Sequence, residues 1–447
     1  MLIRKLARPK YLFLLLLALS VAFKVGVSLL LIPLKTEPSL LDQDEQEYYF
    51  YAGDLLKGHY EFNSRRTLGH ILILAIFRLI TFDNFQATQL LTTVIFSFTA
   101  PLTYLLVRRI TGHNLLAVVV SVLTIVWPPY IYYGRSLYSE TTALPIFTSL
   151  LILLPKGSIL QKNQSEGNWR HWGLCGVLLG LCMLIRPMYL LFIPFVLLIV
   201  FLEELQWLKA LKRTIFLFGG CFLVVLPWSI YMTTNAGVPI IISANGGETI
   251  AGGFNPTLIQ KGYQSVSAPD GRMTWEGPGK WIPLHRTGYL SEEELKLPYP
   301  QQDTLLKQRS LAWVFQHPGS ALYLQGAKLL YMWGFYPLQV DKQTLLGSIP
   351  TVIALILSII SLVRFREYVR HLVRFWTLPI FVSGVALISW GSWRFRQPGD
   401  LGILTLSSLL VLSLLFPSLE VLPKKDRGQE AGDRRKKRQF LPSAKRV

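Results

Sequence analysis

The sequence predicts an all-α, polytopic membrane protein, a transmembrane helix bundle of about 10–12 spans. Of its 447 residues, 51% are hydrophobic and 16% are charged, whereas a typical soluble protein is about one quarter charged. The stretches 11–23 and 345–363 contain no charged residue. A bilayer core about 30 Å thick needs roughly 20 apolar residues per helix. About ten segments approach that length, so the bilayer is the expected solvent for most of the chain.

The positions of the basic clusters indicate how many of the apolar segments span the membrane. The ten predicted spans are 11–33, 86–107, 113–133, 139–154, 171–185, 187–205, 213–232, 345–363, 375–392 and 400–416. With a cytoplasmic N-terminus, ten spans place Arg108-Arg109 and the run from Lys209 to Arg213 inside, as the positive-inside bias requires. Two more spans, over the shorter segments 68–82 and 319–338, would place both clusters outside. We therefore expect those two segments to lie along the membrane or dip into it.

This topology divides the chain into parts with different surroundings. A basic cytoplasmic N-terminus (1–10) precedes a transmembrane catalytic module (11–232), which includes a first external loop (34–85) with membrane-parallel helices. A mixed external loop region (233–344), transmembrane helices (345–416) and a basic cytoplasmic tail (417–447) follow. The first span is read as uncleaved, with a signal peptide as the alternative.

The formal net charge of +19 does not indicate nucleic-acid binding. Four Lys or Arg lie in the first ten residues and ten lie after residue 418, at the two ends of the chain. No basic groove on a folded soluble scaffold is visible, so no nucleic-acid partner is expected. Cys175, Cys182 and Cys221 lie inside apolar runs and are expected to pack there.

The most informative stretch is LLDQDEQEYYFYAGDLLKGHY in the first external loop. Asp44, Glu45, Tyr48, Tyr51 and Leu55 fall on one face of a short helix, and the aromatic residues are of the kind that anchors a helix at the headgroup level. A carboxylate at the membrane surface is partly desolvated, which raises its pKa and improves it as a base.

The acids of this loop have competing interpretations. Asp42 fits a helix N-cap with Glu45 as its capping-box partner, and Glu47 fits a solvated helix face. Asp44 has no evident structural duty. Asp44 is therefore the first candidate for a catalytic base, and Glu45 the second.

Further candidates lie far along the chain. Arg186 sits between two apolar runs, and an intramembrane charge is functional by default; its expected partner is Glu140 or a phosphate. Glu140 opens a span, where it can cap the helix dipole, pair with arginine or orient an acceptor. Arg394 and Arg396 lie at an external helix end, where they can grip phosphate or extend toward the interface.

The order of these motifs resembles the GT-C glycosyltransferases, multi-pass enzymes that use polyprenyl-phosphate sugars. The nearest branch includes protein O-mannosyltransferases and aminoarabinose transferases. Asp44-Glu45, Tyr48, Ala52 and the segment 58–60 resemble the family's first lumenal loop. RRTLGH stands where the family commonly has paired prolines. The resemblance implies that Asp44 is the catalytic base, with Glu45 adjacent.

Four later segments extend the resemblance over residues 10–410. RSLYSETTALPIF contains Glu140, and LLGLCMLIRPMYLLFIP contains Arg186. The stretch from Pro227-Trp228 to Asn245-Gly246-Gly247 resembles the opening of the large external loop, and WRFRQPGDLGIL contains Arg394 and Arg396. The resemblance implies that Glu140, Arg186, Arg394, Arg396, Tyr48 and Asn245 bind substrate.

The expected function is therefore transfer of a sugar from a polyprenyl-phosphate donor to an acceptor hydroxyl or amine on the outer face of the cytoplasmic membrane. Inversion by an Asp base is expected. The acceptor can be a lipid, a polysaccharide or a protein. A transporter or flippase of lipid-linked glycans is the alternative, although no internal repeat is found. A non-catalytic assembly subunit also stays open.

No cofactor is firmly implied. His59, His70, His285 and His317 are scattered, and no metal-binding spacing is present. The histidines are expected to be structural or solvated, and a divalent metal requirement stays open.

Overall fold

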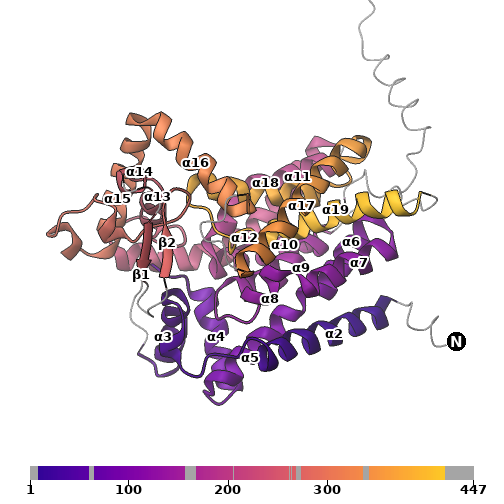
Figure 1. Cartoon of the computed structure of the whole chain (residues 1–447), viewed down its shortest axis with the longest axis horizontal. Helices are drawn as coiled ribbons and strands as arrows, with labels where there is room; N and C mark the ends of the chain where they lie inside the picture. Colours follow the sequence, from indigo (N-terminus) through magenta and orange to yellow (C-terminus); the bar gives the residue numbers. More distant parts are fainter. Residues whose placement is uncertain are drawn as a thin grey trace, which may run out of the picture.

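A computed structural model of the chain describes residues 9–59, 65–156, 168–204, 206–260, 262, 264–267, 273–335 and 342–417. The predicted helical bundle is confirmed, and Figure 1 shows its long helices running in similar directions. The bundle helices are α2 (Pro9–Leu30), α5 (Phe85–Ser97), α6 (Thr99–Thr111), α7 (Asn114–Val126), α8 (Pro128–Tyr133), α9 (Glu140–Leu153), α10 (Trp169–Ile185), η2 (Pro187–Phe192), α11 (Ile193–Glu203), α12 (Trp207–Ala236), α17 (Lys342–Arg364), α18 (Val373–Ile388) and α19 (Gln397–Leu415).

Each of the ten predicted spans overlaps one of these helices or a consecutive pair. Among the described residues, five helical stretches are long and apolar enough to cross a membrane: Pro9–Leu30, Phe85–Thr111, Trp207–Ala236, Gly347–Arg364 and Gln397–Leu415. The other predicted spans are shorter apolar helices. Segments 68–82 and 319–338 also form short helices, α4 (Leu68–Ile80) and α16 (Pro318–Trp333), and neither belongs to the five.

Helices α10 and α12 pack at close range because glycines face each other. A Cβ on Gly176 would lie 1.8 Å from the carbonyl oxygen of Leu217, and one on Gly220 would lie 2.0 Å from that of Gly173. Small residues allow such close approach of helix backbones in membranes. All three cysteines are buried without a disulfide, as expected for packing residues.

We expect Gly176→Val to push α10 and α12 apart and to lower the free energy of unfolding by about 1–3 kcal/mol, the usual cost of overpacking. Gly173→Val is the matched control, because a Cβ there meets nothing within 4 Å. The measurement is the monodisperse fraction after heating in detergent. Equal loss in both variants would contradict the assigned contact.

The first loop folds into two short helices held against the bundle. Helix α3 (Gln43–Leu56) follows the turn η1 (Pro38–Leu40) and runs across the direction of α2 (Figure 1). Arg78 of α4 fastens α3, because its Nη1 donates to the Tyr49 carbonyl at 2.6 Å and its guanidinium lies 4.1 Å from the Tyr49 ring centroid. His70 of α4 is fully buried against Thr142 Oγ1 and the Leu137 carbonyl.

A second group of elements lies at the same end of the bundle, at the left of Figure 1. We call it the 246–333 module. Asp303 anchors the start of α13, since its Oδ1 accepts from the Glu248 N–H at 2.8 Å. Its two described strands, β1 and β2, pair antiparallel. The elements are α13 (Gly246–Gly253), α14 (Pro256–Gln260), β1 (Gln264–Ser267), β2 (Met273–Glu276), η3 (Leu284–Arg286), η4 (Glu294–Lys296), α15 (Tyr299–Gln316) and α16.

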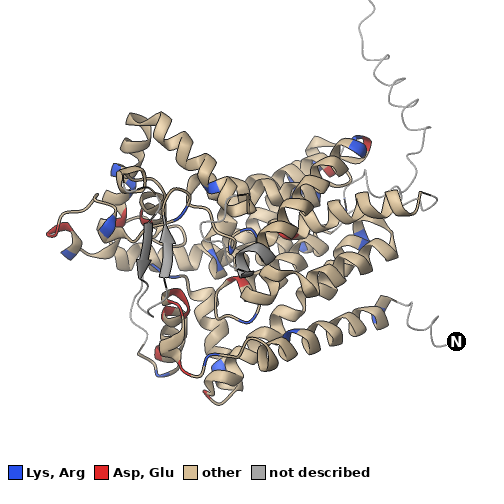
Figure 2. Ribbon diagram, viewed as in Figure 1, with Lys and Arg blue, Asp and Glu red and all other residues tan. Residues whose placement is uncertain are grey.

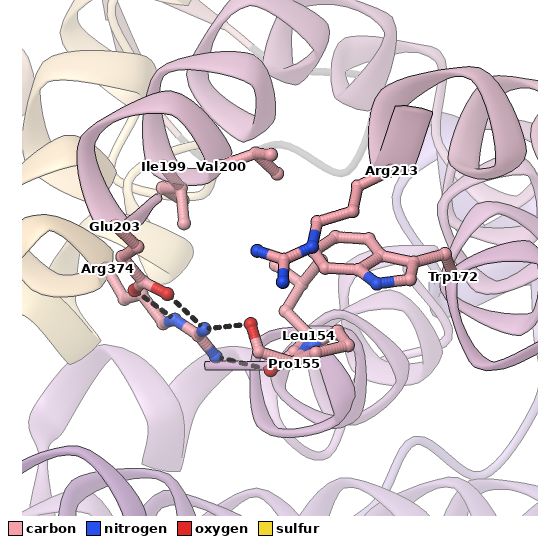
Figure 3. A pocket seen from close by; sticks show the side chains of 8 residues that line it. All are labelled: Leu154, Pro155, Trp172, Ile199, Val200, Glu203, Arg213 and Arg374. Carbon is pink, nitrogen blue, oxygen red and sulfur yellow. Dashed lines mark hydrogen bonds and ion pairs between the residues drawn. The ribbon is translucent and has the colours of Figure 1, made fainter. Parts of the chain in front are cut away.

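At the end of the bundle opposite the 246–333 module, a buried arginine connects two helices. Arg374 is fully buried and forms two 2.6 Å bonds with Glu203, and it also donates to the carbonyls of Leu151, Leu154 and Pro155 at the C-terminus of α9 (Figure 3). Its guanidinium therefore satisfies carbonyls that a helix end leaves unpaired.

Several of the described basic residues lie near this Arg374 end. Arg213 pairs with Glu204 there, and the charge of Arg374 acts on that of Arg109. Helix α9 runs for 14 residues from Glu140 toward this end. Glu140 and the Arg374 end of the bundle therefore lie about 20 Å apart along α9. Figure 2 shows most acidic residues toward the opposite end, on α3 and the 246–333 module.

Candidate functional site

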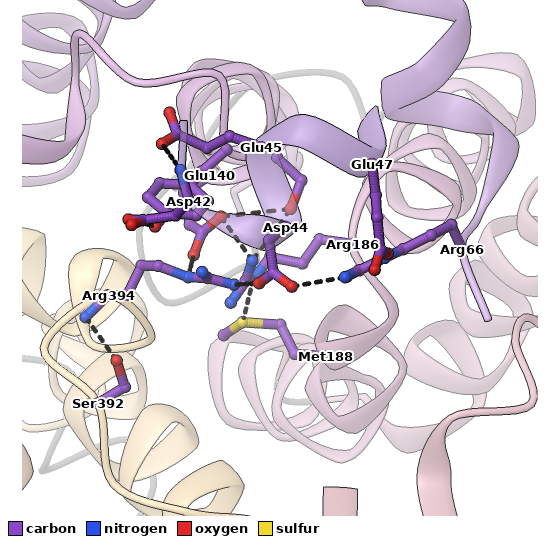
Figure 4. Close-up of polar contacts among 12 residues, drawn as sticks. Asp42, Asp44, Glu45, Glu47, Arg66, Glu140, Arg186, Met188, Ser392 and Arg394 are labelled. Atoms are coloured by element: carbon purple, nitrogen blue, oxygen red, sulfur yellow. Dashed lines mark hydrogen bonds and ion pairs between the residues drawn. The ribbon is translucent and has the colours of Figure 1, made fainter. Parts of the chain in front are cut away.

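The carboxylate of Asp44 lies between two arginines from distant parts of the chain (Figure 4). Asp44 is in the first turn of α3. Its Oδ1 accepts from Arg66 Nη2 at 2.5 Å, and its Oδ2 accepts from Arg394 Nη2 at 2.8 Å. The Asp44 side chain is 30% exposed, so this contact lies at the rim of the bundle. Asp44 and Arg394, which are 350 residues apart in the sequence, are thus in direct contact.

Glu140 extends the contact inward. This first residue of α9 is 4% exposed, and its carboxylate pairs with Arg186 Nη1 at 2.6 Å and with Arg394 Nε. Arg186 Nη1 also donates to Ser139 Oγ at 3.0 Å. The expected pairing of Arg186 with Glu140 is therefore present, and Arg394 bridges Asp44 and Glu140.

A second branch joins Asp44 to the 246–333 module. Arg66 Nε contacts Glu47 at 2.6 Å, and Arg65 contacts Glu47 at 3.1 Å and Glu248 at 2.9 Å. The linked side chains carry four positive and four negative charges, so they balance. We call this set the acid–arginine cluster: Asp44, Glu47, Arg65, Arg66, Glu140, Arg186, Glu248 and Arg394.

The cluster controls the acidity of Asp44. Burial by itself raises the pKa of Asp44, but the charges and hydrogen bonds of Arg394 and Arg66 outweigh it and hold the pKa well below its ordinary value. Burial likewise lowers the pKa of Arg394, and Glu140 and Asp44 outweigh it and raise that pKa. The expectation of a raised pKa at Asp44 is wrong for the unliganded site.

Aromatic rings support both arginines that touch Asp44. The Arg394 guanidinium lies 4.2 Å from the Tyr138 ring centroid, and the Arg66 guanidinium lies 5.1 Å from that of Tyr48. Tyr48 is buried and packs edge-on against His70 at 4.7 Å. Such contacts hold a guanidinium in place without using its N–H donors. The structure thus brings Tyr48 to the site as a support for Arg66.

Three predicted site residues, Glu45, Arg396 and Asn245, lie outside the cluster. Glu45 is buried with its Oε1 accepting from the Leu137 N–H at 2.7 Å and its Oε2 facing Lys35 and the Asp42 N–H. The predicted capping box with Asp42 is confirmed. Burial raises the pKa of Glu45, but its carboxylate has a structural role and does not join the cluster, because the helix turns it away from Asp44.

Arg396 is likewise outside the cluster. It is fully buried, faces Asp400 at 3.3 Å, and donates to the Met332 carbonyl and to Thr351 Oγ1. Asp400 also accepts from Trp127 Nε1. Arg396 therefore ties α19 to its neighbours inside the bundle.

Asn245 is the N-cap residue of α13, and its Oδ1 accepts from Ser243 Oγ at 2.8 Å. It is not bonded to the cluster. The residue of this segment that reaches the cluster is Glu248, one turn further along α13.

Sequence reasoning missed Arg65, Arg66 and Glu248, and it assigned Glu47 to a solvated face. The Glu47 side chain is 19% exposed and bonded to both arginines, so that interpretation is wrong. The available signal was the adjacent arginine pair in RRTLGH, close in sequence to an acidic helix.

A hollow lies directly inside the cluster. Glu140, Arg186 and Arg394 contribute its charged wall, and Tyr189, Gln397 and several apolar side chains complete it. The lining combines apolar side chains with a few convergent charged groups, and the space that it encloses is too small for a water molecule. Within the described residues, no three His, Cys, Asp or Glu side chains gather as a metal-binding group.

Part of the chain matches a known protein family. Residues 65–231 match the family model described as dolichyl-phosphate-mannose-protein mannosyltransferase. This segment contains Arg65, Arg66, Glu140 and Arg186 of the cluster. No curated protein matches the chain.

Two solved structures, both of an oligosaccharyltransferase from Archaeoglobus fulgidus, resemble the fold. One, the enzyme tethered to an acceptor peptide containing the NVT sequon, is 13% identical with a TM-score of 0.51, over 95% of this chain and 53% of that one. The other, AglB with an inhibitory peptide and a dolichol-phosphate, is 14% identical with a TM-score of 0.49, over 95% and 54%. This chain spans about half the length of either. Part of the chain thus resembles a mannosyltransferase family, and its helical membrane fold resembles that of an oligosaccharyltransferase.

Proposed function

We propose that the protein transfers a sugar from a polyprenyl-phosphate donor to an acceptor hydroxyl or amine, with inversion at the anomeric carbon. The observation that carries the proposal is the Asp44 carboxylate held by Arg66 and Arg394 beside a hollow lined by Arg186. The description of the matched family names a dolichyl-phosphate sugar as donor.

The arginines suit the phosphate of such a donor. Guanidinium groups bind phosphate through two parallel N–H bonds, and Arg186 and Arg394 both face the hollow. Glu140 touches both and sets their spacing. In this proposal Glu140 is a positioning residue.

The reaction needs a base and a leaving group. The acceptor oxygen or nitrogen attacks the anomeric carbon as the bond from that carbon to the phosphate oxygen breaks. The polyprenyl phosphate leaves with the electron pair, and Asp44 takes the acceptor proton. Attack from the face opposite the phosphate inverts the configuration.

Donor binding would also activate Asp44. Both carboxylate oxygens of Asp44 accept hydrogen bonds from arginine, and the charges of the cluster balance. A phosphate that binds Arg394 adds negative charge and competes with Asp44 for the same guanidinium. Asp44 then loses one cation, so its pKa rises and one of its oxygens becomes free to accept a proton.

The cluster is proposed to face the outside of the cytoplasmic membrane. It lies at the end of α9 opposite the buried Arg374 and the basic residues near it. Basic segments mark the cytoplasmic side of membrane proteins. The acceptor stays open among lipid, polysaccharide and protein.

The test is turnover of a donor panel by the purified protein in detergent: polyprenyl phosphates carrying mannose, glucose, galactose or N-acetylglucosamine. We expect the protein to bind sugar-free polyprenyl phosphate and to consume at least one donor. Absence of both binding and consumption by a monodisperse protein would overturn the proposal.

The pH dependence tests the activation of Asp44. The free enzyme holds Asp44 ionised well below pH 4, so kcat/KM for the donor should show no acid limb from this group. After donor binding the Asp44 pKa rises, so kcat should fall as the pH drops through the raised value. Both profiles are measured from pH 4 to 8. Superimposable acid limbs would contradict displacement of Asp44 by the donor.

A further inference from the structure

The hollow inside the cluster has one polar side chain that the ion pairs do not use. Gln397, the first residue of α19, lines the hollow together with Glu140, Arg186 and Arg394. The residue is 1% exposed, and neither its Oε1 nor its Nε2 has a hydrogen-bond partner in the described part of the chain.

The backbone around Gln397 is fixed. Its carbonyl accepts from the Tyr130 hydroxyl at 2.6 Å. On one side is the fully buried Arg396, bonded to Met332 and Thr351, and on the other is Pro398. The amide is therefore held at the hollow by rigid neighbours.

A buried amide without partners is costly and rare. Buried polar groups are almost always hydrogen-bonded, and each exception needs an explanation. The charged groups of the hollow are already paired: Glu140 with both arginines, and Arg186 also with Ser139. The Gln397 amide, by contrast, offers its full bonding capacity to a ligand.

The chemistry of the amide distinguishes parts of the donor. A glutamine amide both donates and accepts hydrogen bonds, which complements a sugar hydroxyl. A phosphate has only acceptors at neutral pH and is better matched by Arg186 and Arg394. The free amide thus favours the sugar over the phosphate as its partner.

We propose that Gln397 binds a hydroxyl group of the donor sugar and sets which sugar is accepted. The proposal rests on the function proposed above and adds a specificity-determining residue to it. A site that hydrogen-bonds a substrate hydroxyl discriminates against analogues that lack it, because the buried partner is then left unpaired.

The test compares Gln397→Leu with the wild type on the panel of polyprenyl-phosphate sugars and on monodeoxy analogues of the best donor. We expect kcat/KM for the best donor to fall about tenfold, with little change for the analogue that lacks the bound hydroxyl. The preference for the best donor over that analogue should therefore shrink by the same factor. Gln325→Leu on α16 is the control, since Gln325 does not line the hollow.

Binding of sugar-free polyprenyl phosphate separates this inference from the proposed function. Gln397→Leu should bind it as tightly as the wild type does, which also shows that the variant is folded. Equal loss for every sugar, or lost affinity for the sugar-free lipid, would assign Gln397 a structural role and overturn the inference. Failure of the wild type on all donors would instead overturn the proposed function.

Discussion

Asp44→Asn is expected to reduce kcat by about 10²–10⁴-fold, the usual contribution of a general base. The asparagine keeps the shape of the side chain and can still contact Arg66 and Arg394, but it cannot take a proton from the acceptor. Because the substitution removes one negative charge from the balanced cluster, affinity for sugar-free polyprenyl phosphate should be kept or increased. Lost turnover together with retained lipid binding distinguishes a base from a structural residue.

Asp54→Asn is the matched control on the same helix. Asp54 forms no ion pair with another described residue and lies outside the cluster, so turnover by this variant should equal that of the wild type. Undiminished kcat in Asp44→Asn would remove Asp44 as the base. Since Glu45 is bound to the Leu137 N–H and Lys35, the remaining exposed carboxylates of the loop would then have to be tested.

The bundle could be predicted from sequence because its physical cause is local. Apolar runs of span length predict helices whatever they pack against, and the ten predicted spans all overlap helices. The short helices α4 and α16 were harder to place, because length and hydropathy alone do not distinguish a span from a helix on the rim.

The site was only partly predictable. Asp44 and Glu45 are neighbours, and both were candidates for the catalytic base. Only the direction in which α3 points them distinguishes the residue that joins the cluster from the capping residue. Arg394 and Arg396 present the same ambiguity. They lie two residues apart in a turn, so one faces Asp44 and the other faces Asp400.

Arg66 was missed for a different reason. Its role depends on contact with Asp44, 22 residues earlier, and with Glu47, and a pair of arginines in a loop has no periodicity that reveals such partners. The same holds for Glu248, whose partner Arg65 is 183 residues away. Ion pairs between distant segments follow from the tertiary fold, not from local pattern.

Arg394→Met is expected to reduce kcat/KM for the sugar donor by about 10²–10³-fold. This is the usual effect of removing one strong hydrogen-bond donor from a site that stabilises charge. The guanidinium is the group shared by Asp44, Glu140 and, as proposed, the donor phosphate. Its loss therefore weakens lipid binding and leaves Asp44 paired with Arg66 alone and Glu140 paired with Arg186 alone. Affinity for sugar-free polyprenyl phosphate should fall in parallel with kcat/KM.

Arg394→Lys tests whether charge or geometry matters. Lysine keeps the charge but has no planar fork, so it can contact Asp44 or Glu140 but cannot bridge them as the guanidinium does. We expect an intermediate loss. Arg309→Met is the control: Arg309 pairs with Glu294 at the surface of the 246–333 module, where an ion pair contributes little.

The two main substitutions should differ in their effect on the lipid. Asp44→Asn removes a competitor of the phosphate and keeps lipid binding, whereas Arg394→Met removes the phosphate ligand and loses it. If Arg394→Met bound sugar-free polyprenyl phosphate as tightly as the wild type, Arg394 would serve only to hold Asp44. The arginine that binds the donor would then have to be Arg186, which faces the same hollow and is already paired with Glu140.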